Sequence, residues 1–227
     1  MGVGPIEARP YVWPYDGAVS AEHLAVLSID WQGDWIMPGG VFDTMGFAYE
    51  GLRVALEPTA RVLDAARRAG AAVVHTREGH EPGLSDCPPT KQFRMRHFGA
   101  PIGAMGSGGR MLIRGEPGWD IVDDVKPVLG DWVIDKPGKS AFFATDLDLK
   151  LRTHGITHLV LTGITTDVCV TTTLPDASDR GYETLLLEDC TADLTPEQTR
   201  ICIENVARSP FGAVACSEAF IAALVGT

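Results

Sequence analysis

The sequence predicts an α/β protein, a three-layer αβα sandwich around a six-stranded parallel sheet of the Rossmann-like type. Two observations lead to this prediction. Short apolar runs alternate along the chain with amphipathic stretches of helical periodicity. Glycine or proline marks several of the boundaries between them. Because strand and helix alternate, we expect the strands to lie parallel, with helices on both faces of the sheet.

Six runs are too short for helices and apolar on both faces, which is typical of buried parallel strands. These expected strands are 24–30, 71–76, 131–135, 158–162, 183–187 and 212–215. Amphipathic stretches follow or precede them, and the expected helices are 56–69, 145–153, 167–180, 196–208 and 217–225. Gly70, Gly155 and Gly181 stand where helices end, as C-cap glycines do. Thr195 and Pro196 supply a capping residue and a first-turn proline.

The length of 227 residues with 45% hydrophobic content fits one compact domain, 1–227, in which 1–23 form an N-terminal extension. The formal charge of −11, from 19 basic and 30 acidic residues, would repel a phosphate backbone. No apolar run approaches the length of a membrane span, and no leader-like segment opens the chain. We therefore expect a cytoplasmic protein with neither nucleic acid nor membrane as partner.

Five cysteines are present, an odd number without paired CxxC spacing. This pattern indicates neither a disulfide framework nor a zinc site, so the thiols are expected to be free. His75 and His80 could offer metal ligands only if the chain bends at Gly79, and we interpret them as one core histidine and one loop histidine. No dinucleotide-binding glycine motif follows any strand, which weakens an NAD-binding alternative.

Polar residues at strand ends are the candidates for chemistry, because ligands of open α/β sheets bind beyond the carboxyl ends of the strands. Asp30 ends the first strand, Lys136 follows the third, and Cys169 follows the fourth at the start of a helix. The helix N-terminus is expected to lower the pKa of the thiol and make it a nucleophile. Two long loops, 31–50 and 79–118, begin at the same edge and are expected to bind ligand.

A thiolate that attacks an amide carbonyl needs a proton carrier, a group that orients it, and donors for the oxyanion. Asp30 and Lys136 can take the first two roles, and the backbone N–H groups of Thr165 and Cys169 the third. Trp35 could give a planar substrate an apolar wall, although buried packing is the commoner fate of tryptophan. Each residue has an ordinary structural explanation when taken alone. Their convergence at one edge favours catalysis.

Three motifs in this order resemble those of the isochorismatase-like cysteine hydrolases: LSIDWQ at 27–32, DKP at 135–137 and LTGITTDVCV at 161–170. The likeness runs over about 24–225. It implies the isochorismatase-like hydrolase fold and a catalytic triad of Asp30, Lys136 and Cys169. It also implies a non-proline cis peptide between Ile164 and Thr165, and a homo-oligomer, commonly a tetramer. The DxH metal site of the nicotinamidase branch is missing, so neither a metal nor another cofactor is implied.

Within the family the sequence is most similar to biuret amidohydrolases, on the segments YVWPY at 11–15, HTREGH at 75–80, RGEPGWD at 114–120 and IDKPGK at 134–139. The resemblance implies hydrolysis of a small ureido or carbamoyl amide, with biuret converted to allophanate and ammonia as the first hypothesis. Thr165, Trp35 and Lys139 are the expected substrate contacts. Ureidoacrylate or another carbamoyl amide is the second hypothesis. A catalytically silent binding protein of the same fold is the third.

Two features depart from the family pattern. Pro175 lies within the predicted helix of the nucleophile and removes one backbone hydrogen bond there. The segment 207–212 is shorter than the matching loop of biuret amidohydrolases, which contributes substrate contacts. The second difference leaves open which ureido compound is the substrate.

Overall fold

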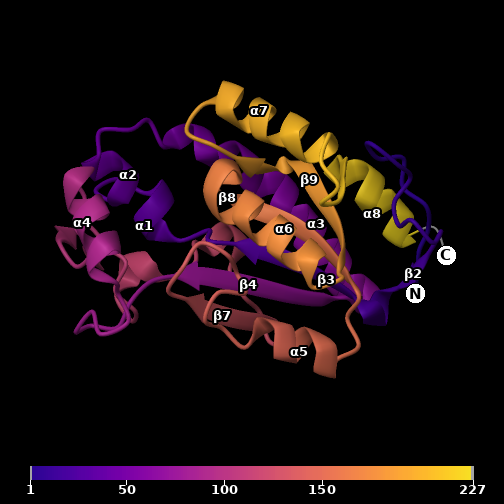
Figure 1. Ribbon diagram of the computed structural model, residues 1–227, viewed down its shortest axis with the longest axis horizontal. Helices are drawn as coiled ribbons and strands as arrows, with labels where there is room; N and C mark the ends of the chain where they lie inside the picture. The colour runs from indigo at the N-terminus through magenta and orange to yellow at the C-terminus, as the bar shows by residue number, and fades with distance from the viewer. Residues whose placement is uncertain (1, 226–227) are drawn as a thin grey trace.

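The computed structural model describes residues 2–225, and its centre is a six-stranded sheet with helices on both faces (Figure 1). The strands are β3 (Leu24–Ile29), β4 (Ala72–Glu78), β7 (Trp132–Lys136), β8 (His158–Ile164), β9 (Glu183–Ala192) and β10 (Ala213–Ala215). Their order is β10-β9-β8-β3-β4-β7, and every pair is parallel. The predicted fold class is thereby confirmed.

The two faces of the sheet carry separate apolar clusters, because the strands are buried on both sides and alternate residues point to opposite layers. One cluster packs α3 (Leu56–Ala69) and α8 (Ser217–Val225) against the sheet. The other packs α5 (Leu147–Thr153), α6 (Thr171–Asp179) and α7 (Pro196–Ala207) against the opposite face. These are the three layers of the sandwich.

The N-terminal segment forms a two-stranded antiparallel sheet, β1 (Gly2–Val3) with β2 (Val19–Ser20). Val3, Ile6 and Trp13 are fully or almost fully buried and join the apolar cluster that contains α3 and α8. The segment therefore contributes to the core and does not simply extend from it. No helix among residues 2–225 is both long and apolar enough to cross a membrane.

The long loops contain short elements that the sequence did not predict. They are α1 (Gly33–Ile36), α2 (Val41–Thr44), α4 (Pro89–His97) and a hairpin of β5 (Met105–Gly106) and β6 (Gly109–Arg110). Figure 1 shows α1, α2 and α4 together at the end of the molecule toward which the β4 arrow points, opposite the two chain termini. The loops thus cover the carboxyl edge of the sheet, as expected for ligand-binding loops.

The strand order reverses direction between β3 and β8, which is where open α/β sheets form a crevice. Gly163 of β8 lies opposite Ile29 of β3 there, with a φ of 124°. A Cβ at this glycine would come within 2.3 Å of the Ile29 carbonyl oxygen. Only glycine lets the two backbones approach this closely at the crevice.

Candidate active site

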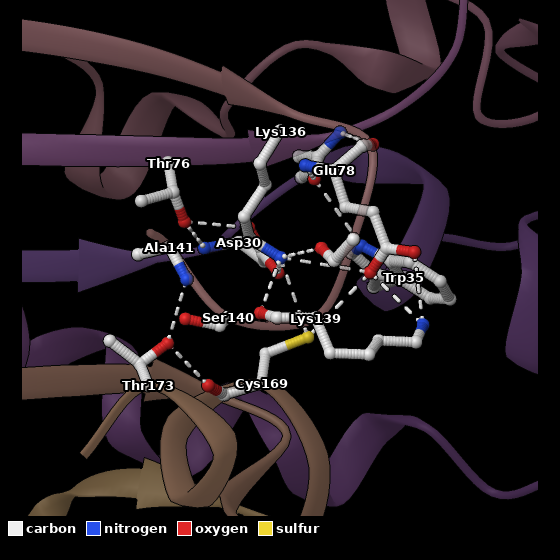
Figure 2. Close-up of polar contacts among 12 residues, drawn as sticks. Asp30, Trp35, Thr76, Glu78, Lys136, Lys139, Ser140, Ala141, Cys169 and Thr173 are labelled. Carbon is white, nitrogen blue, oxygen red and sulfur yellow. Dashed lines mark hydrogen bonds and ion pairs between the residues drawn. The ribbon is translucent and has the colours of Figure 1, made fainter. Parts of the chain in front are cut away.

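Four ionisable side chains meet where the central strands end (Figure 2). Asp30 follows β3, Glu78 and Lys136 are the last residues of β4 and β7, and Cys169 follows β8. All four are buried, none with more than 5% of its surface exposed. Parallel strands bring their carboxyl ends to one edge, so residues far apart in sequence become neighbours here.

The Asp30 carboxylate is fixed through both of its oxygens. Oδ1 accepts a hydrogen bond of 2.7 Å from the Thr76 hydroxyl, and Oδ2 lies 2.7 Å from the Lys136 ammonium. Asp30 has a φ of 56°, in the left-handed region that aspartate tolerates better than most residues. This turn takes the chain out of β3 while its side chain stays at the sheet edge.

Lys136 connects the carboxylate to the thiol. Besides Asp30, its ammonium donates to the carbonyl oxygens of Gly138 at 2.9 Å and Lys139 at 3.0 Å, and it lies 3.6 Å from the Cys169 sulfur. Burial alone would lower its pKa, but the carboxylates and the thiol around it raise the pKa above its usual value. The lysine therefore stays charged and holds the loop after β7.

Cys169 lies in a π-helical turn, Thr166–Val170, that leads into α6, where the sequence predicted one continuous helix over 167–180. Its carbonyl accepts a 2.7 Å hydrogen bond from the Thr173 hydroxyl, which in turn accepts one from the Ala141 N–H. These contacts join the turn to the loop after β7. Pro175 lies inside α6, which nevertheless continues to Asp179.

The expected lowering of the Cys169 pKa was wrong. Burial of the thiol is the largest effect and raises its pKa, and the carboxylates of Asp30 and Glu78 raise it further. The lysines oppose this shift without reversing it. Burial therefore favours the neutral thiol over the thiolate in this site.

Glu78 is the functional residue that the sequence analysis missed. Its Oε2 accepts from the Cys169 thiol at 3.6 Å and from the Lys139 ammonium at 3.0 Å. Its Oε1 binds Lys139 at 2.9 Å and Lys91 of α4 at 2.6 Å. Burial raises the pKa of this carboxyl, but the three lysines, Lys139 foremost, lower it well below its ordinary value. The lysines thus favour the anionic form of Glu78 beside the thiol.

A signal for Glu78 was present. The apolar run of the second strand ends at Thr76, and the prediction placed the strand end there, whereas β4 pairs with β7 as far as Glu78 and Lys136. Polar residues can continue a strand when their backbone groups still have partners. Had the strand been extended by two residues, the rule that strand ends carry chemistry would have selected Glu78.

Gln32 keeps Glu78 in place. Its Oε1 accepts from the Glu78 N–H at 2.7 Å, and its Nε2 donates to the carbonyl oxygens of Glu78 at 3.0 Å and Trp119 at 2.7 Å. Gln32 is completely buried. This glutamine of the LSIDWQ motif therefore ties together the first long loop, the end of β4 and the second long loop.

The expected substrate-contact residues surround the same centre. Trp35 of α1 is 7% exposed, and its ring centroid lies 5.7 Å from the Lys139 ammonium (Figure 2). Thr165 opens the turn that carries Cys169, and its hydroxyl donates to Asp167 at 2.7 Å. The bond between Ile164 and Thr165 is a cis peptide, where the family resemblance implied one.

A cavity of about 800 Å³ opens onto this centre. We define its polar floor as the lining residues Asp30, Glu78, Lys91, Lys139 and Cys169, together with Lys136, which lies behind them and contacts the Cys169 sulfur. Its apolar wall consists of side chains from the two long loops, namely Trp35, Phe42, Met45, Phe47, Met95 and Phe98. The cavity thus places a charged centre beneath an apolar entrance.

Asp30, Glu78 and Cys169 each offer an atom within 4.8 Å of the others, and such a donor set could in principle hold a metal ion. The Lys136 ammonium lies among them, 2.7 Å from Asp30 and 3.7 Å from Glu78. Lys139 adds a second cation against Glu78. Because the lysines already supply positive charge to these ligands, the donor set fits a metal poorly.

Among the described histidines and cysteines, Cys169 alone lines the cavity. His75 is buried in β4 against Asp131, as expected for a core residue. His80 lies in the second long loop, as expected, and is completely buried there, with Nδ1 3.3 Å from Asp86. The cysteines carry no disulfide, and the four outside the site are Cys87, Cys190, Cys202 and Cys216.

Fold and site together define a class: parallel α/β proteins that carry a thiol, a lysine and buried carboxylates at the carboxyl edge of the sheet. Within that class the match is specific, because the model of the Isochorismatase domain family covers residues 24–219. The chain belongs to this family, which confirms the resemblance read from its motifs.

Similar proteins agree with this assignment. Ureidoacrylate amidohydrolase RutB of Azorhizobium caulinodans is 34% identical over 200 residues, which are 83% of this chain and 85% of the relative. The N-carbamoylsarcosine amidase of Thermoplasma acidophilum is 26% identical, with a TM-score of 0.66 over 86% of this chain and 96% of that one. A cysteine hydrolase of Pseudomonas syringae pv. phaseolicola reaches a TM-score of 0.78 over 92% of this chain and 95% of that one, and its 24% identity supports the fold alone.

Proposed function

We propose that this protein is a cysteine amidohydrolase that cleaves a C–N bond of a small ureido or carbamoyl amide. The observation that carries the proposal is the buried relay in which Lys136 lies 2.7 Å from Asp30 and 3.6 Å from the Cys169 sulfur. The amidohydrolase activities in the names of RutB and N-carbamoylsarcosine amidase support the reaction class.

The proposed reaction begins with attack of the Cys169 sulfur on the substrate carbonyl while the thiol proton moves to Asp30. Asp30 then delivers this proton to the leaving nitrogen, the C–N bond breaks, and a thioester remains on Cys169. A water molecule hydrolyses the thioester, and the thiol is restored. The raised pKa of Cys169 requires such a carrier, and Asp30 lies within 4.8 Å of the sulfur.

The backbone N–H groups of Thr165 and Cys169 are the proposed donors to the tetrahedral oxyanion, since both belong to the turn that presents the sulfur. Lys136 orients Asp30 and stabilises the negative charge that develops on sulfur. Glu78 cannot easily accept the thiol proton, because the lysines lower its pKa. It offers instead an acceptor for the N–H groups of the substrate, beside the donor Lys139.

An acceptor next to a donor is complementary to a ureido group, which presents N–H and C=O side by side. Biuret, hydrolysed to allophanate and ammonia, is the first substrate we propose. Ureidoacrylate is the second, because the cations Lys91, Lys139 and Arg94 line the cavity and could pair with its carboxylate. Both hypotheses use the same catalytic residues.

The deciding experiment measures ammonia release from biuret, ureidoacrylate, N-carbamoylsarcosine and nicotinamide. Wild type and Cys216→Ser, a matched control outside the cavity, should both turn over a ureido substrate. Cys169→Ser should lose at least about 10³-fold in kcat/KM. A quenched reaction should show the acyl group on Cys169 by mass spectrometry. Full activity of Cys169→Ser would contradict the mechanism, and the absence of turnover would favour a silent binding protein.

We further propose that the molecule is one domain over 1–227 and a cytoplasmic homotetramer. The unpaired cysteines support a reducing compartment. The burial of Val3, Ile6 and Trp13 in the main core supports the single domain. Sedimentation or light scattering would test the oligomeric state directly.

A further inference from the structure

The aromatic side of the apolar wall is a row of three rings that begins at the polar floor. The Trp35 centroid is 5.7 Å from the Lys139 ammonium, the Phe42 ring is 5.1 Å from Trp35, and the Phe47 ring is 6.4 Å from Phe42. Exposure rises along the row, from 7% at Trp35 to 43% at Phe47. The row therefore leads from the reacting centre to the mouth of the cavity.

The opposite side of the cavity is one face of α4. Lys91, Met95 and Phe98 line it at intervals of four and three residues, the spacing at which helical side chains share a face. Lys91 reaches the floor and binds Glu78, while Phe98 remains 58% exposed. The face thus changes from charged to apolar in the same direction as the aromatic row.

The floor and the wall differ in what they can recognise. The charged groups of the floor lie within a few ångströms of Cys169 and suffice for a carbamoyl group. A cavity of about 800 Å³ is in the range that encloses drug-sized ligands, and biuret would occupy only a small part of it. Apolar side chains left exposed at a surface typically mark a ligand-binding groove or an interface with another protein. Phe47 and Phe98 line the same cavity as Cys169, which favours a ligand here.

We infer that the substrate is a carbamoyl compound bearing a bulky apolar substituent, which lies along Trp35, Phe42 and Phe47 while its ureido end meets the polar floor. This inference rests on the proposed function and specifies its substrate class. The sulfur attacks the terminal carbamoyl carbon, the bond to the terminal nitrogen breaks, and ammonia leaves with the proton from Asp30. Water then releases the substituted carbamate, so the substituent stays on the acyl product.

The test compares three substrates that share one scissile bond: biuret, 1-benzylbiuret, and 1-(2-hydroxyethyl)biuret as a polar control. Ammonia release reports all three reactions equally. Burial of the benzyl group should raise kcat/KM at least about 10-fold over biuret, mainly through a lower KM. The hydroxyethyl compound should not exceed biuret, because it gains no comparable apolar contact.

Substitutions in the aromatic row test whether the benzyl group binds there. Phe42→Ala should reduce the ratio of kcat/KM between 1-benzylbiuret and biuret by about 10-fold or more, and the partly exposed Phe47→Ala should reduce it less. Leu149→Ala, an exposed position on α5 outside the cavity lining, should leave the ratio unchanged. Thermal melting of each variant checks that the fold is intact.

The outcomes separate this inference from the function on which it rests. Equal kcat/KM for 1-benzylbiuret and biuret would overturn the inference and leave the amidohydrolase proposal standing. A preference for the benzyl compound that survives in Phe42→Ala and Phe47→Ala would also overturn it. Failure to hydrolyse any ureido compound would overturn both proposals. A ratio that falls in the two wall variants alone would support the aromatic row as the substituent site.

Discussion

The floor and the wall of the cavity are built in different ways. The floor residues Asp30, Glu78, Lys136 and Cys169 stand at the ends of buried strands or directly after them, and their charged groups bind one another. The wall residues belong to two long loops with short helices and contact mainly through apolar surface. The proposed function thus assigns the reaction to the floor and the choice of substrate to the wall, and the buried charge pairs of the floor should also support the fold.

Removal of a charge from the floor should have the largest effect. Lys136→Met would leave Asp30 and Glu78 buried without their shared cation, so we expect the free energy of unfolding to fall by about 3–5 kcal/mol. The activity should fall at least about 100-fold as well. Urea denaturation and ammonia release measure the two effects. If stability were unchanged, the floor would not support the fold.

A second variant tests the connection between the floor and the loops. Gln32→Leu would leave the N–H and the C=O of Glu78 buried without partners, each at a cost of about 1–3 kcal/mol. We therefore expect a loss of about 2–4 kcal/mol in unfolding free energy, with a higher KM because Trp35 and Trp119 also lose a contact. Wild-type stability and KM in Gln32→Leu would show that Gln32 does not hold the end of β4 and the two long loops together.

Asp34 of α1, next to the wall residue Trp35, should make the stability of the protein depend on pH. Burial raises the pKa of its carboxyl to about 6, although its Oδ2 accepts a 2.7 Å hydrogen bond from the Leu112 N–H. Because the folded protein binds this proton more tightly than the unfolded chain does, stability should fall as the pH rises from about 4 to about 6. Asp34→Asn keeps the acceptor and does not titrate.

Across that pH range, Asp34→Asn should become more stable relative to wild type by about 1–3 kcal/mol. Denaturant unfolding at a series of pH values measures this difference. A difference between the two proteins that does not vary with pH would show that the Asp34 carboxyl does not titrate there.

The smallest expected change in stability comes from truncating an exposed wall residue, and it can be compared with the loss at a core residue. Phe47→Ala in the wall should change the unfolding free energy by no more than about 0.5 kcal/mol, since 43% of Phe47 is exposed. Leu27→Ala, a fully buried residue of β3, should cost about 2–5 kcal/mol. Thermal or denaturant unfolding compares the pair. Similar losses for both would mean that the wall supports the fold as the core does.

The sequence allowed the sheet and its main helices to be predicted, because apolar runs and terminal glycines are local signals. It failed where a strand continues through polar residues. The apolar run of β4 ends at Thr76 although pairing continues to Glu78, and β9 passes Glu188 and Asp189 before it ends at Ala192. The helices α1 and α2 have only about one turn each, and α4 buries no residue, so none of the three shows an apolar pattern of helical period.

The candidate triad could be predicted because motifs and strand ends pointed to the same residues. The electrostatics could not, because they depend on distances between segments remote in sequence. A helix start suggested a lowered pKa for Cys169, but burial of the thiol raises it, and Asp30 and Glu78 within 4.8 Å raise it further. The wall was expected to contain Trp35, yet its continuation through Phe42 and Phe47 is visible only in three dimensions.

The side chain of Gln32 takes the place of backbone at the carboxyl end of the sheet. β3 stops at Ile29, but its neighbour β4 continues to Glu78, whose N–H and C=O face the space that β3 has left. The Gln32 amide pairs with both groups in the manner of one more residue of β3. A side chain thus substitutes for a length of strand, which frees the backbone at Asp30 to turn away. A residue at position 32 without a side-chain amide should therefore leave both backbone groups at the end of β4 without partners, whatever side chain stands at position 78.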